Sequence, residues 1–190
     1  MTPEWIADAT KREVVNEGLK LNRYLDSLGI PTIGIGYNCT RGTGPLVLCS
    51  IPNPSAVIAG DAGITEAQAY CLLANDLAYA VSDARASLRQ GIFDAMSEAR
   101  QFVITDLCYN MGLATWLGFI TTRQLIEQAQ RQKASGSADA HTSFVTAGDH
   151  IQQSAYYQQT GDRAKRNVAM LVTGEYCNPE GNGSDIYQGA

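Results

Sequence analysis

Residues 17–38 read EGLKLNRYLDSLGIPTIGIGYN, and the organisation of the chain follows from this stretch. A helix-forming run ends at Glu17, and the chain then enters a segment that we expect to form a hairpin. Asp26 follows Glu17 by nine positions. The two carboxyl groups can face one another only if the chain changes direction between them, and Gly18 and Gly29 permit such changes.

The two carboxylic acids and a neighbouring hydroxyl group are candidates for acid–base catalysis. Glu17 ends the first helix with Gly18 as its C-cap, where the negative end of the helix dipole disfavours the ionised carboxylate, which suits a general acid. Asp26 and Thr32, on extended chain across a groove, can hold one water molecule. Inverting glycosidases combine an acid, a base and a bound water in this way. The alternative is that Glu17 and Asp26 are ordinary surface charges, and the spacing alone does not decide between the two interpretations.

The wider motif resembles a known active-site signature. The pattern Glu-x8-Asp-x5-Thr followed by Ile-Gly-Ile-Gly, here Glu17, Asp26, Thr32 and residues 33–36, is similar to that of the phage-type lysozymes, the T-even phage muramidase and its endolysin relatives. In that family the Glu is the proton donor, and the Asp and the Thr manage the water. The resemblance implies these roles for Glu17, Asp26 and Thr32, and it implies no metal or cofactor.

The resemblance covers roughly residues 14–176. Residues 109–112 (YNMG) and 156–166 (YYQQTGDRAKR) are similar to family patterns in the second half of the chain. Tyr37 stands where the T-even enzyme has a histidine paired with the aspartate that matches Asp76. A tyrosine hydroxyl can hydrogen-bond Asp76 but cannot form that charge pair.

The same correspondence points to supporting residues. Arg163 matches the family arginine that pairs with the catalytic Glu, so the resemblance implies that it orients Glu17; the alternative is a solvated helix charge. The positions that match substrate-contacting positions of the family are Tyr109, Thr122, Asn38 and His150. The first two match in kind, and the last two differ in residue type. A surface or core role is the alternative for His150.

The resemblance implies an α+β, mainly α, lysozyme-like two-lobed fold, with a small antiparallel sheet lobe joined by a long helix to a helical lobe. A chain of 190 residues is long enough to bury a core as a single lysozyme-like domain, 1–190. We expect the small lobe at 18–64, the interlobe helix at 65–88, the helical lobe at 1–17 and 89–176, and a loose tail at 177–190.

Local patterns predict the individual elements. Thr2 and Pro3 begin a helix expected over 3–16. Thr65 caps a long helix whose apolar residues recur at steps of three and four. The stretch from about 21 to 57 is rich in Gly, Pro and β-branched residues, which favours a small sheet with loops, and its prolines exclude a continuous helix. Further helices are expected at about 97–111, 117–132, 148–158 and 162–173, with a polar loop at 134–140.

Composition and charge exclude several classes of protein. Hydrophobic residues make up 45% and charged residues 17% of the chain, as in globular proteins. No run of about 18 apolar residues exists, so we expect no transmembrane helix. The net charge of −5 argues against nucleic-acid binding and supplies no long-range attraction to a polyanionic cell envelope.

The five cysteines have no C-x-x-C spacing; they are Cys39, Cys49, Cys71, Cys108 and Cys177. We interpret them as small buried apolar residues, above all Cys71 and Cys108. The alternative for Cys39 and Cys49, which bracket a loop, is a hairpin disulfide in an oxidising compartment. A zinc site is not expected, because neither histidine lies at ligand spacing from a cysteine.

Taken with the resemblance, these residues predict a muramidase that cleaves the β-1,4 bond between N-acetylmuramic acid and N-acetylglucosamine in bacterial peptidoglycan. Glu17 would protonate the leaving oxygen, and Asp26 with Thr32 would activate water on the far face, with inversion and a carboxyl separation of about 6.5–9.5 Å. One alternative is a lytic transglycosylase, which cleaves the same bond without water. The other is a non-catalytic peptidoglycan-binding domain, which we expect to lack at least one of these three residues.

The expected partner is the glycan strand, bound by a monomer without membrane insertion. The start MTPEWIADATKRE has no basic flank followed by an apolar stretch, so we expect no cleavable signal. We therefore expect synthesis in a host cytoplasm and delivery to the cell wall or periplasm by a holin or a secretion system. An endolysin, a tail-associated muramidase and a secreted antibacterial effector all fit this expectation.

Overall fold

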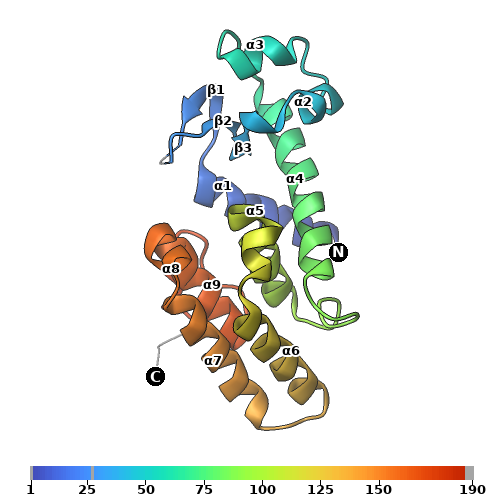
Figure 1. The fold of residues 1–190 in the computed structure, drawn as a ribbon, viewed down its shortest axis with the longest axis vertical. Helices are drawn as coiled ribbons and strands as arrows, with labels where there is room; N and C mark the ends of the chain where they lie inside the picture. Colours follow the sequence, from blue (N-terminus) through green and yellow to red (C-terminus); the bar gives the residue numbers. More distant parts are fainter. Residues whose placement is uncertain (1, 27, 187–190) are drawn as a thin grey trace. The chain divides into compact units, whose positions relative to one another are not determined.

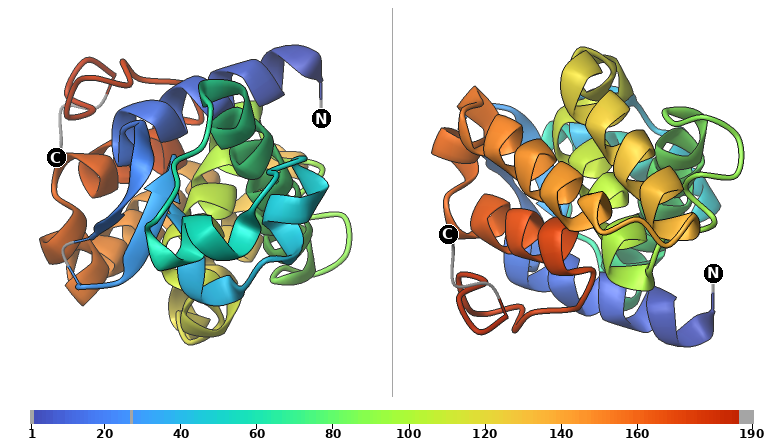
Figure 2. Two further views of the ribbon diagram at one scale, coloured as in Figure 1. Left: turned by 90° about the horizontal axis from the view of Figure 1, so that it is seen from above. Right: turned by 90° about the horizontal axis from the view of Figure 1, so that it is seen from below.

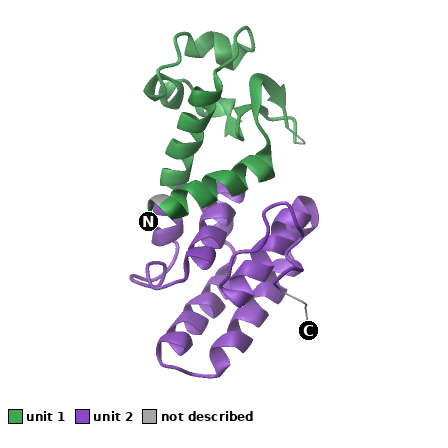
Figure 3. Cartoon of the chain, turned by 180° about the vertical axis from the view of Figure 1, so that it is seen from behind, with its two compact units in different colours: residues 1–79 green, residues 80–190 purple. Residues whose placement is uncertain are grey.

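A computed structural model describes residues 2–26 and 28–186, which form a mainly helical α+β fold with a small three-stranded antiparallel sheet (Figure 1). The predicted fold class is confirmed. The chain separates into two compact units, residues 1–79 and 80–190 (Figure 3). The boundary between them falls within one long helix, and the first helix belongs with the sheet in the first unit.

Helix α1 (Pro3–Glu17) begins and ends at capping residues. The Thr2 hydroxyl accepts a hydrogen bond from the Trp5 N–H at 3.1 Å, and a proline occupies the first turn. At the other end Gly18 has a φ of 72° and donates its N–H to the Val14 carbonyl at 2.9 Å. The helix therefore ends at Glu17, one residue beyond the predicted span.

The sheet consists of three short strands in the order β1-β2-β3, namely β1 (Lys20–Leu25), β2 (Pro31–Gly34) and β3 (Tyr37–Asn38). Both pairings are antiparallel. Thr32 lies in the middle strand, opposite Tyr24 on one side and Asn38 on the other. The small antiparallel sheet predicted for this part of the chain is thus present, and Thr32 lies at its centre.

The remainder of this segment is more helical than predicted. It contains the 3-10 turn η1 (Cys39–Arg41) and the short helices α2 (Gly44–Leu48) and α3 (Pro54–Ala59). Pro45 and Pro54 occupy the first turn of α2 and α3, where the missing N–H has no intrahelical acceptor to lose. The prolines exclude one continuous helix, as expected, but they favour the start of two short ones.

Cys49 and Cys71 form a disulfide across the first unit, with their Cα atoms 5.7 Å apart. It joins the C-cap of α2 to helix α4 (Glu66–Ala86). The alternative of a Cys39–Cys49 hairpin disulfide is wrong, and so is the interpretation of Cys49 and Cys71 as merely apolar side chains. The chain between Cys39 and Cys49 folds into η1 and α2 instead of a hairpin, and Cys39 is a buried free thiol.

Helix α4 begins at the predicted position and carries a buried charge. The backbone N–H of Thr65 donates to Oε1 of Gln68 at 2.8 Å, and the backbone N–H of Gln68 donates to Oγ1 of Thr65 at 3.2 Å. This reciprocal pair of hydrogen bonds is a capping box. Further along, Asp76 is 6% exposed and pairs with Arg41 of η1 at 2.7 Å. The Tyr37 hydroxyl donates to the Gly42 carbonyl at 2.9 Å. Arg41, and not Tyr37, therefore supplies the partner of Asp76.

The second unit is helical. Its elements are the end of α4, α5 (Glu98–Leu117), α6 (Ile120–Ala134), α7 (Asp139–Gln152), α8 (Ala155–Thr160) and α9 (Asp162–Thr173). Helices α6 and α7 run side by side, and α9 packs against α7 (Figures 1 and 2). The bounds predicted for a helix at 148–158 are wrong, because α7 already begins at Asp139 and Ser154 caps a separate helix by accepting from the Tyr157 N–H at 3.3 Å. The predicted loop shrinks to residues 135–138.

The C-terminal segment packs on α9 as far as the structure describes it, whereas we expected a loose tail. Cys177 is buried, and Arg166 donates to the Gly181 carbonyl at 2.6 Å. A Cβ atom at Gly183 would lie 2.9 Å from Ala169 Cβ, so the segment lies close against the helix. Residues 187–190 of the predicted tail lie outside the described residues.

Among the described helices, none is by itself long and apolar enough to cross a membrane. Only α5 and α6 together meet that length and hydropathy, and they form a pair bent by 111°. Both helices contribute buried side chains to the second unit.

Removal of the disulfide should destabilise the protein. The double substitution Cys49→Ala and Cys71→Ala is expected to lower the free energy of unfolding by about 2–4 kcal/mol, because the cross-link no longer restricts the unfolded chain. Urea denaturation with and without dithiothreitol measures this change. On reduction, the free energy of unfolding of the unsubstituted protein should fall by a similar amount. The control Cys108→Ala removes a buried free thiol and leaves the disulfide in place, so reduction should lower its free energy of unfolding by the same amount. Insensitivity of the unsubstituted protein to reductant would contradict the pairing.

The Arg41–Asp76 pair should make stability depend on pH. Burial raises the pKa of Asp76, and the Arg41 guanidinium opposes this rise. The folded state therefore binds the Asp76 proton more tightly than the unfolded state, and stability is lost as the pH rises through the folded-state pKa. Arg41→Met removes the opposing charge. This substitution should lower the free energy of unfolding only slightly near pH 4 and by about 2 kcal/mol near pH 7. The loss is smaller than for breaking a fully buried ion pair because the Arg41 side chain is 41% exposed.

Urea denaturation at the two pH values tests this dependence. Arg85→Met is the matched control, because Arg85 forms an exposed pair with Asp94 and its loss should cost less than about 1 kcal/mol at either pH. If the loss of stability caused by Arg41→Met did not increase from pH 4 to pH 7, Arg41 would not be the group that balances the buried Asp76 carboxylate.

Candidate active site

Glu17 lies above the backbone of Gly36. A Cβ atom at position 36 would lie 3.0 Å from both Cγ and Cδ of Glu17 and 3.1 Å from its Oε2. Gly36 also has a φ of 74°, a conformation that other residues rarely adopt. The turn between β2 and β3 therefore leaves room for the carboxyl group at the end of α1, and only glycine provides that room.

The other residues of the Ile-Gly-Ile-Gly run pack the turn into the core. Ile33 and Ile35 are buried at 0% and 1% exposure. A Cβ atom at Gly34 would lie 3.4 Å from the side chains of Ala69 and Ile64, so this glycine lets the strand lie close to the start of α4. The motif thus combines a buried anchor with an open position beneath Glu17.

Asp26 is held by the turn that connects β1 to β2. Its Oδ1 accepts hydrogen bonds from the N–H groups of Leu28 and Ile30, both at 2.8 Å, and its own N–H donates to the Ile30 carbonyl at 3.0 Å. One carboxylate oxygen is thereby fixed by backbone donors. The position of Asp26 follows from local turn chemistry, since aspartate side chains commonly accept from N–H groups a few residues further along.

Thr32 is 4% exposed and donates its hydroxyl proton to the Ile30 carbonyl at 3.0 Å. Tyr24, its cross-strand partner, reports on the surrounding charges. Burial raises the pKa of Tyr24, and the negative charges of Glu17 and Asp26 raise it further. Both carboxylates therefore lie within electrostatic range of one side chain that faces Thr32. Glu17, Asp26 and Thr32 all belong to the first unit, and Tyr24 is linked to each of them, to the two carboxylates through their charge and to Thr32 through the strand pairing.

Asn38 belongs to the same unit and lies opposite Thr32 in the sheet. Its Oδ1 accepts from the N–H of Thr40 at 2.8 Å and from the Thr40 hydroxyl at 2.7 Å, and so caps η1. The carboxamide oxygen thus has a structural role beside the candidate catalytic residues. Its predicted contact with a sugar stays a prediction.

Arg163, in the second unit, is not a solvated helix charge. Its Nη2 lies 2.7 Å and its Nε 3.0 Å from Oδ1 of Asp106, which is fully buried, and Arg163 itself is 8% exposed. Asn167 and Tyr156 also hydrogen-bond the Asp106 carboxylate. Asp106 and the preceding Thr105 interrupt an apolar run of α5, and a charged residue in that run is the signal by which the sequence could have identified Asp106. The predicted role of Arg163 toward Glu17 stays a prediction.

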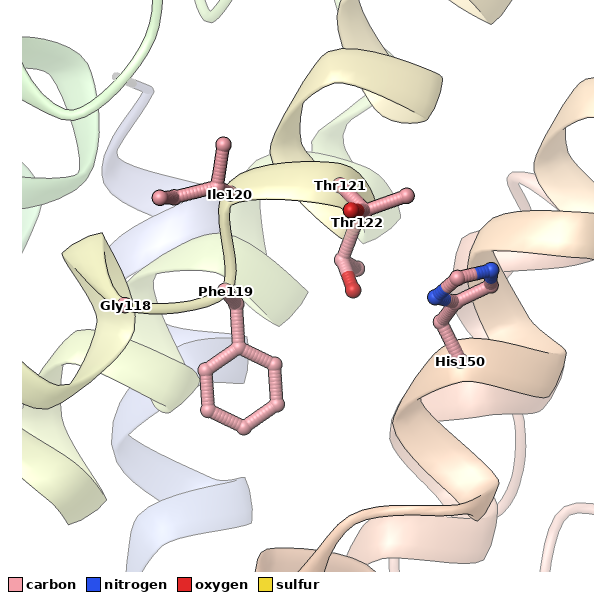
Figure 4. Close-up of a pocket in the computed structure, with 6 residues that line it drawn as sticks. All are labelled: Gly118, Phe119, Ile120, Thr121, Thr122 and His150. Atoms are coloured by element: carbon pink, nitrogen blue, oxygen red, sulfur yellow. The ribbon is translucent and has the colours of Figure 1, made fainter.

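Two of the predicted substrate-contacting residues of the second unit line one pocket of about 440 Å³ (Figure 4). Thr122 comes from the first turn of α6 and His150 from the last turn of α7. The other lining residues are Gly118, Phe119, Ile120 and Thr121. Tyr109 lies half-buried on α5, outside this set.

Metal ligands do not gather in the part of the chain that the structure describes: no group of three or more His, Cys, Asp or Glu side chains there could hold an ion.

Comparison with known proteins points to one family. The phage lysozyme family matches residues 15–159, which include Glu17, Asp26 and Thr32. The chain is 28% identical over 165 residues to the pre-baseplate central spike protein Gp5 of Enterobacteria phage T4, a match that covers 84% of this chain and 26% of that protein. It is 24% identical over 166 residues to probable T4-type lysozyme 1 of Dictyostelium discoideum, covering 84% of this chain and 90% of that protein. The chain thus spans about a quarter of the first relative and nearly all of the second.

The Asp106–Arg163 pair should contribute to the stability of the protein. Arg163→Met leaves a buried carboxylate without its counter-charge and should lower the free energy of unfolding by about 3–5 kcal/mol. Adding Asp106→Leu removes that charge and should restore a large part of the loss. Urea denaturation of both variants measures the difference. A double variant as unstable as Arg163→Met alone would show that the pair does not carry this stability.

Proposed function

The chain belongs to the phage lysozyme family, and from this premise we propose that it hydrolyses the β-1,4 bond between N-acetylmuramic acid and N-acetylglucosamine in bacterial peptidoglycan. The observation that supports this proposal most strongly is the position of the Glu17 carboxyl group over Gly36, in the turn that follows the strand carrying Thr32. A peptidoglycan-binding domain without activity has no need to keep an acid, a second carboxylate and a hydroxyl group in one place.

In the proposed reaction Glu17 protonates the glycosidic oxygen that leaves. The side chain is half-buried at the end of α1 and lies over the backbone of Gly36, which limits its freedom to rotate away. Proton donation by a positioned carboxylic acid typically accelerates such a reaction by about 10²–10⁴-fold.

Asp26 and Thr32 direct the attacking water. The Thr32 hydroxyl proton is used in the bond to the Ile30 carbonyl, so the hydroxyl oxygen is left to accept a hydrogen bond from water. Asp26 Oδ1 is occupied by two backbone N–H groups, and the second carboxylate oxygen is left to accept the other water proton. A water that donates both protons in this way presents its lone pair to the anomeric carbon. Attack on the face opposite Glu17 inverts the configuration.

The supporting groups have narrower roles in this proposal. Arg163, with Nε and Nη2 bound by Asp106, orients Glu17. Asn38, Tyr109, Thr122 and His150 contact the glycan strand. One relative is a pre-baseplate central spike protein of a phage and the other is a probable T4-type lysozyme. We propose that the chain acts at the cell wall as a monomer, delivered either with a phage particle or as a free lytic enzyme.

Loss of the proton donor should abolish activity without unfolding the protein. Glu17→Gln keeps the shape of the side chain, so the melting temperature should not change, whereas the rate of peptidoglycan clearing should fall by at least about 10²-fold. Glu4→Gln, an exposed substitution on the same helix, is the matched control and should behave like the unsubstituted protein. If Glu17→Gln cleared peptidoglycan at more than a tenth of the rate of the unsubstituted protein, Glu17 would not be the proton donor.

Hydrolysis and transglycosylation are distinguished by the products. In water enriched in oxygen-18, a hydrolase adds the heavy oxygen to the new reducing end, and an inverting one gives the α anomer first. A lytic transglycosylase gives an anhydro end that contains no solvent oxygen. Mass spectrometry with rapid NMR of the released muropeptides therefore decides the reaction type. An anhydro product, or retained β configuration, would overturn the roles given to Asp26 and Thr32.

A further inference from the structure

The C-terminal segment carries an Asn–Gly pair, Asn182 and Gly183, and no other asparagine of the chain is followed by glycine. The backbone nitrogen that follows an asparagine can attack the side-chain amide of that asparagine. A glycine at this position leaves the nitrogen uncovered, because it has no side chain and adopts backbone conformations that other residues avoid. The sequence therefore distinguishes Asn182 from the other asparagines as a site for this reaction.

The structure brings the reacting groups of this pair together. The Ser184 N–H donates to Oδ1 of Asn182 at 3.1 Å, which closes a turn between an asparagine side chain and the backbone two residues further along. The Gly183 nitrogen lies inside this turn, next to the side-chain amide carbon. The same hydrogen bond stabilises the negative charge that develops on Oδ1 during attack, as backbone donors do in an oxyanion hole.

The Gly183 nitrogen is available for the reaction. Among the described residues its N–H donates to no backbone carbonyl, and Gly183 has a φ of 84°. Asn182 and Ser184 are exposed, so water and hydroxide can reach the turn. The Asn178 N–H donates to Oδ2 of Asp185 at 2.8 Å and holds the two ends of the loop together. The loop therefore keeps the reacting groups in place while leaving them open to solvent.

We propose that Asn182 is a site of spontaneous deamidation in the folded protein, and that the reaction releases the C-terminal segment from α9. Hydroxide removes the Gly183 amide proton, and the nitrogen forms a bond to Cγ of Asn182. The bond from Cγ to the side-chain nitrogen breaks, and that nitrogen leaves as ammonia with a proton from water. A cyclic imide remains. Water then opens this ring at either carbonyl, giving aspartate or isoaspartate, and no oxidant or reductant is needed.

The isoaspartate product does not fit the place that the segment occupies on α9. In isoaspartate the main chain runs through the side-chain carbons and is longer by one carbon before Gly183. A Cβ atom at Gly183 would lie 2.9 Å from Ala169 Cβ and 3.1 Å from the Lys165 carbonyl oxygen, so the backbone here has no room to shift toward the helix. The neighbouring bond from Arg166 to the Gly181 carbonyl depends on the same placement.

The first test measures deamidation by peptide mass spectrometry during incubation at mildly acidic and mildly alkaline pH, with isoaspartate detected by enzymatic methylation. Asn182 should be converted faster at alkaline pH, and at least as fast in the native protein as in urea. Asn110, which is exposed and followed by Met111, is the internal comparison and should stay intact over the same time. Conversion of Asn182 that is slower in the native protein than in urea, or no faster than that of Asn110, would overturn the site.

The second test uses the Cys177 thiol, which is 3% exposed in the same segment. After incubation at alkaline pH its rate of labelling by a thiol reagent should rise by at least about 10-fold in the deamidated fraction, because labelling follows the population of the open segment. The buried thiols of Cys39 and Cys108 should keep their rates and so exclude general unfolding.

Two variants separate the chemistry from its consequence. Asn182→Gln closes the corresponding ring far more slowly, so incubation should leave its Cys177 protected. Freshly purified Asn182→Asp carries the new charge on a main chain of normal length and should also keep Cys177 protected. Unchanged labelling of Cys177 in the deamidated fraction would overturn the release of the segment, and equal labelling in Asn182→Asp would show that charge, and not the lengthened chain, causes it.

Discussion

The close approach of Glu17 to Gly36 is the constraint on which the candidate active site depends. It arises because α1 ends at Gly18, whose positive φ turns the chain into β1 and leaves Glu17 at the last helical position. The sheet must then return beneath that position with a residue that has no side chain. One glycine ends the helix and another admits its terminal carboxyl group. The spacing between them is set by the two strands of the hairpin.

The two candidate catalytic groups on the hairpin are placed by backbone hydrogen bonds. Asp26 is held by two N–H groups of its own turn, and Thr32 is held by the carbonyl of Ile30. Such contacts require only that the turn keeps its length and its glycine, so the rest of the first unit can differ widely in sequence.

Much of this organisation could be predicted from the sequence because its signals are local. The cap at Thr2, the capping box at Thr65 and the hairpin around Asp26 each depend on residues within a few positions of one another. Contacts over longer separations could not be predicted in this way. Cys49 pairs with Cys71 because α2 packs against α4, and no spacing rule encodes that packing.

Long-range pairing also explains what the sequence missed about buried charge. Asp76 and Asp106 are both buried, and each is balanced by an arginine of its own unit, Arg41 or Arg163. Tyr37 cannot form a charge pair with Asp76, and Arg41 supplies the positive charge from four residues further along the chain. An ion pair can keep its role while one partner moves to a new position, because the buried carboxylate requires a cation within reach and not a particular residue at a particular place. Matching positions one by one is therefore least reliable for charge pairs and most reliable for glycines, whose absence of a side chain has no substitute elsewhere in the chain.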